Sequence, residues 1–396
     1  MKNSVYILAG SRTPIGSYGG NLSTISAIEL GAIAIKGALL KAKIAPEYIE
    51  TVVMGNVLSA NLGQAPARQA SMGAGLPESV CATTVNKVCA SGMKATSMLY
   101  NDIMLGNCEV GIAGGMENMS QVPHYIPNGR FGLGYGNSSV IDGLALDGLT
   151  DAYNKTSMGV SGDKTAEKYN LSREDQDDFA EQSYRKSTEA WKSDSFTDEV
   201  TVVSVPQRKG NPIVVKEDET YSKANFEKMR QLKPAFSLDG TVTAANASPM
   251  NDGASALVLA GEKFVKANNL KPLARIVAYA EAEQDPTFFT TTPVLATQKV
   301  LQKANLVISD IDFFEVNEAF SVVPMAFMKL LKVEPQKVNV FGGAVALGHP
   351  LGSSGSRIIV TLLNILQTKK AKYGLATICN GGGGASAIII ENLNHG

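Results

Sequence analysis

The sequence predicts an α/β protein made of two similar halves with a long insertion between them. Three observations lead to this prediction. Short apolar runs alternate with stretches of helical periodicity, the pattern of layered strands and helices. The same order of segments recurs near both ends of the chain, and the middle is poor in strand-like runs. We divide the chain into a first half over residues 1–120, completed by about 250–272, an inserted loop domain over 121–249, and a second half over 273–396.

The first half contains three predicted strands and two predicted helices. The strands are short apolar runs that end in glycine or polar turns. The helices carry apolar side chains at three- and four-residue spacing. Strands are expected at residues 5–9, 51–55 and 109–113, and helices at 24–41 and 93–105.

The insertion is dominated by glycine, proline, lysine and acidic residues. Its clearest element is a polar helix over residues 172–192, with Ser172 as the predicted N-cap. Long insertions between regular elements often form lids or binding loops, so this one is expected to contribute to a binding site.

The second half repeats the order of the first. Strands are expected at residues 311–316 and 375–379, and a helix at 355–367. Each half places a reactive residue at the start of a predicted helix, Cys89 in one and His349 in the other, followed by a strand and a glycine turn. This repetition indicates an internal duplication.

Charge and composition exclude several classes of protein. The 396 residues include 36 Lys and Arg against 37 Asp and Glu, which leaves a net charge of −1. That balance gives no general attraction for nucleic acids or anionic membranes, so neither is an expected partner. With 44% hydrophobic and 18% charged residues, the chain can fill a large core and is not disordered.

The cysteines and the chain ends bear on location. Four cysteines without a Cys-x-x-Cys pair indicate neither a disulfide framework nor a zinc site. Reduced thiols are typical of the cytoplasm. No apolar run reaches the roughly 20 residues of a membrane span. We expect a cytoplasmic protein, or a mitochondrial one if a presequence has been removed.

Cys89 is the first candidate catalytic residue. Residues 85–94 bring it, in the context Asn-Lys-Val-Cys-Ala-Ser-Gly, to the start of an amphipathic helix. Backbone N–H groups and the helix dipole there are expected to favour the thiolate, the form that a nucleophile requires. The alternative is a small buried core cysteine, the commonest fate of a free thiol.

His349 lies in a glycine-dense turn over residues 339–357, and Pro350 suits the first turn of the helix that follows. A histidine here is able to polarise a carbonyl or tune a thiol. The alternative is a structural histidine that satisfies the turn.

Two further segments carry candidate groups. Residues 377–385 read Thr-Ile-Cys-Asn-Gly-Gly-Gly-Gly-Ala and contain Cys379 and Gly381, whose glycine backbone offers either an oxyanion hole or a phosphate loop. Asn317 ends a predicted strand, where it either holds a functional carboxamide or caps a helix.

Taken together, these segments resemble the thiolase family over nearly the whole chain. The joint motifs are Asn-Lys-Val-Cys-Ala-Ser-Gly, Gly-His-Pro-x-Gly and Cys-Asn-Gly-Gly-Gly-Gly-Ala, in family order. Residues 240–254 and 274–278 are similar to the biosynthetic branch, the acetyl-CoA acetyltransferases. The resemblance implies the five-layered α-β-α-β-α fold and the reversible condensation of two acetyl-CoA into acetoacetyl-CoA and CoA.

The resemblance also implies a role for each candidate. Cys89 would carry the acetyl group as a thioester in a ping-pong reaction, with a pKa lowered by His349, which would later donate to the second thioester. Cys379 would be the acid and base. Asn317 would hold a water for the enolate oxyanion, and the N–H groups of Cys89 and Gly381 would bind the tetrahedral oxyanion.

Ligand contacts are implied in the same way. No tightly bound cofactor is expected; coenzyme A is substrate and product, and its predicted contacts are Tyr184, Lys223, Ala224, Asn225, Lys228 and Ser248. Some relatives bind potassium, and the matching positions here are Tyr184, Ala244, Ala245, Ala247 and Val345. A homo-oligomer, dimer or tetramer, acting in lipid metabolism is expected.

Several alternatives remain open. The nearest is a degradative 3-ketoacyl-CoA thiolase of broader chain length, with the same catalytic residues. A ketoacyl synthase is disfavoured because Cys379 and Asn317 stand where two histidines would be expected. A non-catalytic CoA-binding module and an NAD-dependent dehydrogenase are the other classes considered.

Overall fold

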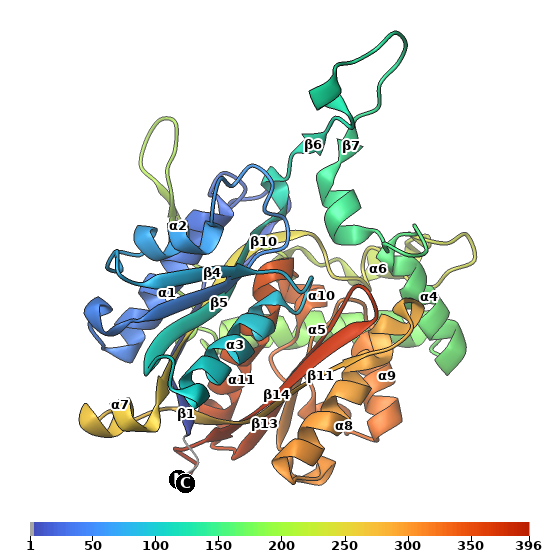
Figure 1. Cartoon of the computed structure of the whole chain (residues 1–396). Coiled ribbons are helices and arrows are strands. Elements are labelled where there is room, and N and C mark those ends of the chain that lie inside the picture. The colour runs from blue at the N-terminus through green and yellow to red at the C-terminus, as the bar shows by residue number, and fades with distance from the viewer. Residues whose placement is uncertain (1–3, 396) are drawn as a thin grey trace.

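The computed structural model describes residues 4–395, and its centre is one mixed sheet of ten strands (Figure 1). Residues 1–3 and 396, the outer ends of the two predicted halves, lie outside the described residues. The strand order is β12-β13-β14-β11-β1-β10-β5-β3-β4, with β2 paired to β10. The strands are β1 (Val5–Arg12), β2 (Gly16–Ser17), β3 (Thr51–Gly55), β4 (Cys81–Val85), β5 (Val110–Asn118), β10 (Asn251–Gly261), β11 (Ala274–Glu283), β12 (Phe313–Val316), β13 (Tyr373–Asn380) and β14 (Gly384–Asn392).

The sheet is nearly symmetric about the junction of β1 with β11. On one side β3 runs parallel to β5, and β5, β10 and β1 pair antiparallel in turn. On the other side β12 runs parallel to β13, and β13, β14 and β11 pair antiparallel in turn. The two sets correspond strand for strand, which agrees with the duplication that the sequence predicts.

Helices cover both faces of each half and separate the halves. The helices α1 (Ala27–Ala42) and α2 (Pro66–Gly73) pack outside the first half, and α8 (Thr292–Ala304) and α9 (Val322–Leu331) outside the second. Between the halves lie α3 (Ser91–Leu105) and α11 (Leu351–Lys369), and α11 contacts β5 and β10 on one side and β12 and β13 on the other. The order of layers is therefore α-β-α-β-α, as predicted.

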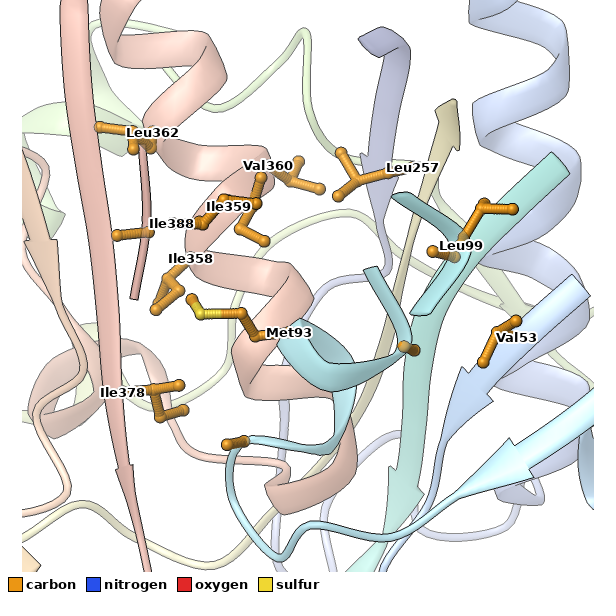
Figure 2. Packing of buried hydrophobic residues seen from close by; sticks show 14 of the residues in the cluster. Val53, Met93, Leu99, Leu257, Ile358, Ile359, Val360, Leu362, Ile378 and Ile388 are labelled. Atoms are coloured by element: carbon orange, nitrogen blue, oxygen red, sulfur yellow. The ribbon is translucent and has the colours of Figure 1, made fainter. Parts of the chain in front are cut away.

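The central layer holds the largest apolar cluster (Figure 2). Met93 and Leu99 of α3 and Ile358 and Ile359 of α11 are almost fully buried in it. Because both helices pack apolar side chains against the sheet strands of the two halves, their N-terminal ends are held in place. Those ends carry the candidate residues Cys89 and His349.

The boundaries of the predicted helices shift by a few residues, for local reasons. The helix predicted over 24–41 begins at Ala27 because Ser26 accepts the N–H of Glu29 in a capping box. The helix predicted over 355–367 begins at Leu351, directly after its N-cap Pro350, so Pro350 is not in the first helical turn as predicted.

The segment between β5 and β10 forms the insertion. It contains α4 (Met158–Tyr169), α5 (Arg173–Lys192) and α6 (Phe226–Gln231), and the two hairpins β6 (His124–Tyr125) with β7 (Ile141–Asp142) and β8 (Val203–Val205) with β9 (Ile213–Val215). Ser172 caps α5 as predicted, with Asp175 completing the capping box. The segment around β6 and β7 projects from the body (Figure 1). The remaining short elements are η1 (Pro46–Tyr48), η2 (Met119–Gln121), η3 (Gly129–Phe131), the π-turn η4 (Ala145–Leu149), η5 (Tyr221–Lys223), α7 (Glu262–Ala267), η6 (Pro286–Thr291), η7 (Ile308–Asp310), η8 (Pro335–Lys337) and α10 (Ala344–Leu347).

A buried ion cluster ties the insertion to the scaffold. Arg12 of β1 is fully buried, with Nε 2.5 Å from Glu199 and Nη1 2.7 Å from Asp218, both in the insertion. Trp191 donates from its indole nitrogen to Asp218 at 3.1 Å.

Over residues 4–395, none of the helices has the length and apolar character needed to cross a bilayer.

Candidate active site

The starts of α3 and α11 meet in the middle layer, and glycines allow their close approach. A Cβ on Gly92 would lie 2.7 Å from the Ser356 nitrogen, and one on Gly55 would lie 2.7 Å from the Gly352 carbonyl oxygen. Both distances are too short for any side chain. Backbone contact between the helix starts brings Cys89, just before α3, and His349, just before α11, to one place.

The turn that carries Cys89 is strained. Val88 has a φ of +46°, in the left-handed region that β-branched residues avoid. Ser91 holds this conformation, because its Oγ accepts the Lys87 N–H at 2.8 Å and donates to the Val88 carbonyl at 2.6 Å. A strained conformation held by its surroundings is common at functional sites.

The protonation state of Cys89 differs from the sequence prediction. Burial raises the pKa of Cys89 to about 12, and the charge of Glu117 acts in the same direction. The N–H groups of Gly381 and of Cys89 itself reach the sulfur and act against this rise. The prediction that the helix start favours the thiolate is therefore wrong for the resting protein, because burial outweighs the backbone dipoles and no lowering by His349 offsets it.

His349 is buried and its imidazole is fixed from two sides. Nδ1 lies 2.6 Å from the Ser354 Oγ, whose proton is directed to the Pro350 carbonyl at 2.9 Å. Nδ1 therefore carries the ring proton and donates to Ser354, which leaves Nε2 as the acceptor nitrogen of the ring. Nε2 lies 3.5 Å from the Asn317 Nδ2. Burial, aided by the charge of Arg357, lowers the pKa of His349 to about 3, so the ring is neutral.

Cys379 and Asn317 lie at the ends of neighbouring strands, Cys379 within reach of the charge of Cys89 and Asn317 beside His349. Cys379, near the end of β13, is fully buried, and burial raises its pKa well above the ordinary thiol value, with a further contribution from Cys89. That contribution means that the two sulfurs lie within electrostatic range of each other. The Asn317 Oδ1 is buried without a hydrogen-bond partner, as an acceptor that holds a water would be. The alternative that Asn317 caps a helix is wrong, because α9 begins at Val322 with Ser321 as its N-cap.

A cavity of about 530 Å³ opens onto Cys89 and His349. Apolar side chains form most of its wall, among them Met119, Leu149, Met158, Phe236, Phe289, Phe320 and Leu351. A mostly apolar cavity with a few convergent polar groups is typical of a small-molecule site.

The residues predicted to contact coenzyme A fall into three places. Ser248 lines the cavity, and its Oγ donates to the Ala319 carbonyl at 3.0 Å. Four others follow Thr220, a cavity residue, through η5 and into α6: Lys223, Ala224, Asn225 and Lys228. Tyr184 is instead buried beneath α6, against the ring of Phe226.

The residues predicted to hold potassium come from the loop of residues 244–247 and from two other segments, those of Tyr184 and Val345. Tyr184, Ala245 and Val345 share a buried cluster, and Ala244 and Ala247 line the cavity. Within residues 4–395 there is no group of three or more His, Cys, Asp or Glu side chains that could hold a metal ion.

Four buried residues of the site have roles that the sequence reasoning missed. Ser354 orients His349, and Asn251 accepts the His349 backbone N–H at 2.9 Å. Glu318 accepts the Val345 N–H at 3.1 Å beside the buried cluster of Tyr184, and Glu117 lies at the end of β5. Ser354, Asn251 and Glu117 stand within or beside segments that contain glycines. For Glu117, a charged residue near the end of a buried strand was the available signal.

Comparison with known proteins extends these observations. The family model "Thiolase, N-terminal domain" matches residues 5–263, and "Thiolase, C-terminal domain" matches residues 270–392. The chain is 53% identical over 390 residues to a probable acetyl-CoA acetyltransferase of Dictyostelium discoideum, covering 98% of this chain and 94% of that one. It is 52% identical over 394 residues to an acetyl-CoA acetyltransferase of Schizosaccharomyces pombe, covering 99% and 100%. The crystal structure of the Acat5 thiolase of Ascaris suum with coenzyme A superimposes with a TM-score of 0.94 at 45% identity, covering 98% and 100%.

Proposed function

The chain belongs to the thiolase family, and we propose that its cavity is where two acetyl-CoA molecules are joined to acetoacetyl-CoA and coenzyme A. The protein is an acyltransferase, an acetyl-CoA acetyltransferase. The observation that carries the proposed mechanism is that Cys89 and His349 line one cavity while the Gly381 N–H reaches the Cys89 sulfur.

The first half-reaction acetylates Cys89. Its thiol proton passes to Nε2 of neutral His349 as the sulfur attacks the thioester carbonyl. The N–H groups of Cys89 and Gly381 stabilise the tetrahedral oxyanion. The departing CoA thiolate takes the proton of Cys379, so CoA leaves as a thiol and the acetyl group waits on Cys89.

The second half-reaction forms the carbon–carbon bond. The Cys379 thiolate removes an α-proton from the second acetyl-CoA. The Nε2–H of protonated His349 and a water held by Asn317 stabilise the resulting enolate. The enolate attacks acetyl-Cys89, the Cys89 sulfur leaves, and His349 returns its proton. Every group regains its starting state, and thiolysis is the same sequence reversed.

The burial of all three proton carriers supports this order. Burial keeps both sulfurs protonated and His349 neutral at rest. In the proposed reaction, the positive charge on His349 and the negative charge on Cys379 therefore appear together inside the closed site, where each stabilises the other. Burial thus confines the thiolate to the reacting complex.

Further parts of the proposal concern binding and organisation. The chain consists of a first half (1–120, completed by 250–272), an inserted loop domain (121–249) and a second half (273–396). The inserted loop domain holds coenzyme A through Ser248 and the segment 223–228. Potassium would bind through Tyr184 and the carbonyls of residues 244, 245, 247 and 345, where it would order the loop beside the cavity. The protein would act as a homo-oligomer, dimer or tetramer, in the cytoplasm.

The decisive experiment is acetoacetyl-CoA thiolysis, followed by loss of the Mg²⁺-enolate absorbance, for wild type and Cys89→Ala. Turnover by the wild type that is lost in the variant supports the mechanism. Cys108→Ala is the matched control, because Cys108 is also buried but does not line the cavity. A wild type without turnover, or an active Cys89→Ala, would contradict it. Comparing C4 with C16 ketoacyl-CoA tests the degradative alternative.

A further inference from the structure

Glu117 ends a buried strand, is fully buried itself, and has no part in the mechanism above. Its carboxylate accepts four hydrogen bonds. Oε1 accepts the Asn56 Nδ2 at 2.9 Å and the Leu58 N–H at 3.1 Å. Oε2 accepts the Val57 N–H at 3.1 Å and the Gly352 N–H at 2.8 Å. Four donors around one buried carboxylate are an arrangement suited to the ionised form.

One of these bonds leads directly to the His349 turn. Gly352 lies in the first turn of α11, and its N–H is one of the groups that a helix start leaves without an internal partner. A Cβ on Gly352 would lie 2.9 Å from the Glu117 Oε2. Glu117 therefore fixes the start of α11 against the end of β5, three residues beyond His349.

The other bonds lead to the Cys89 turn. Glu117 fixes the Val57 backbone, whose carbonyl accepts the Asn86 Nδ2 at 3.3 Å. The Asn86 Oδ1 accepts the Val88 N–H at 2.9 Å, directly before Cys89. The same carboxylate is thus linked to both turns that carry the reacting groups, and these turns lie about 260 positions apart in the sequence.

Glu117 also acts on Cys89 through its charge. Its carboxylate is among the causes that raise the pKa of Cys89. Burial raises the pKa of Glu117 to about 7, with three backbone N–H groups opposing and Asp252 of β10 adding to the rise. The titratable groups that interact with its charge are therefore Asp252 on the neighbouring strand and Cys89 before α3.

We propose that Glu117 is a positioning residue for the acyl transfer: its carboxylate holds the His349 turn and the Cys89 turn at the separation that the reaction requires. This inference rests on the function proposed above. Because small displacements of reacting groups cost large factors in rate, the role belongs to kcat rather than to substrate binding.

The test compares full-length wild type, Glu117→Gln and the control Asp252→Asn. Asp252 is also a buried carboxylate at a strand end, but it holds Ser120 and not α11. Two quantities are measured: kcat and KM for acetoacetyl-CoA thiolysis, and the pH dependence of Cys89 alkylation by iodoacetamide, read by peptide mass spectrometry. For Glu117→Gln we expect kcat to fall on the order of tenfold or more, with KM within about twofold. We expect its alkylation profile to move to lower pH, because a negative charge near the thiol is removed. Asp252→Asn should keep the wild-type kcat.

Two results would overturn the role of Glu117. One is a Glu117→Gln variant with wild-type kcat. The other is a loss of kcat accompanied by an unshifted alkylation profile and a lowered Tm, which a merely structural residue would give. If Glu117→Gln does not fold, Glu117→Asp replaces it: the shorter side chain keeps the charge but withdraws from Gly352, so kcat should fall with KM unchanged, and wild-type kcat would overturn the proposal. A wild type without thiolysis would instead overturn the acyltransferase mechanism, so the two failures are distinguishable.

Discussion

Ser354 lies one helical turn beyond Pro350, and its Oγ is 2.6 Å from Nδ1 of His349. The hydroxyl proton is directed to the Pro350 carbonyl, so the oxygen acts as the acceptor for the ring N–H. This contact and the weaker one from the Asn317 Nδ2 to Nε2, at 3.5 Å, favour the same tautomer, in which Nε2 is the acceptor that receives the Cys89 proton. Removing the Ser354 hydroxyl takes away the shorter of the two contacts.

Ser354→Ala should therefore lower kcat for acetoacetyl-CoA thiolysis on the order of tenfold and change KM little. Ser353→Ala is the control, since Ser353 is on the same helix but bonds to Ser255. Equal kcat values for the two variants would contradict the role of Ser354.

Asn317→Ala should lower kcat further, by about 10²-fold, because its carboxamide both faces Nε2 of His349 and is the holder of the proposed water. Cys89 acetylation does not need that water. Rapid-quench measurement should show a burst of acetyl-enzyme in the variant with slow condensation afterwards. Equal slowing of acetylation and condensation would argue against the assigned water.

The fold and the candidate site residues were predictable because they depend on local pattern. Apolar runs and glycine turns define β1, β3 and β5, and the rare residues Cys89, His349 and Cys379 stand inside specific motifs. Their convergence follows from the two duplicated halves.

Burial and long-range contacts were not predictable in this way. The position of Cys89 at the start of a helix predicted a thiolate, but the depth of its burial decides its pKa. The bond from Gly352 to Glu117 joins residues 235 positions apart, and no local pattern marks it. The burial of Tyr184 beneath α6 was also not predictable, because only packing reveals which face of α5 is covered.

Potassium should stimulate thiolysis and raise the Tm relative to tetramethylammonium chloride at equal ionic strength, since a ligand of the folded state stabilises it. Buried Glu318 accepts the Val345 N–H at 3.1 Å, which places a carboxyl group beside the proposed ligands. Tyr184→Phe should lose this response, and Tyr221→Phe, whose hydroxyl bonds to Glu217, should keep it. No difference between the two salts would contradict the potassium site.

Arg12→Met should destabilise the protein by about 3–5 kcal/mol, because it leaves the buried carboxylates of Glu199 and Asp218 without their partner. Urea unfolding measures the change. Arg230→Met is the control. The ion pair of Arg230 with Asp178 is exposed to solvent, so its loss should change the free energy of unfolding by nothing measurable.

The buried imidazole of His349 predicts a loss of stability in acid. Above pH about 6.5 the ring is neutral in both the folded and the unfolded chain, and it contributes no pH dependence. Below that value the unfolded chain binds a proton that the folded protein, with a His349 pKa of about 3, does not bind. Proton binding then stabilises the unfolded state relative to the folded one. The free energy of unfolding therefore falls by at most about 1.4 kcal/mol per pH unit between pH about 6.5 and about 3. Glu117 acts in the opposite direction, because its raised pKa lets the folded protein retain a proton.

Comparing variants isolates the histidine. Urea midpoints at pH about 7 and about 5 should fall more in wild type than in His349→Gln, while Glu117 contributes equally to both. His124→Gln, at an exposed position on β6, should show the wild-type dependence. If His349→Gln lost stability between the two pH values as steeply as the wild type does, the imidazole would be protonated in the folded protein. Its Nε2 would then be unable to accept the proton of Cys89.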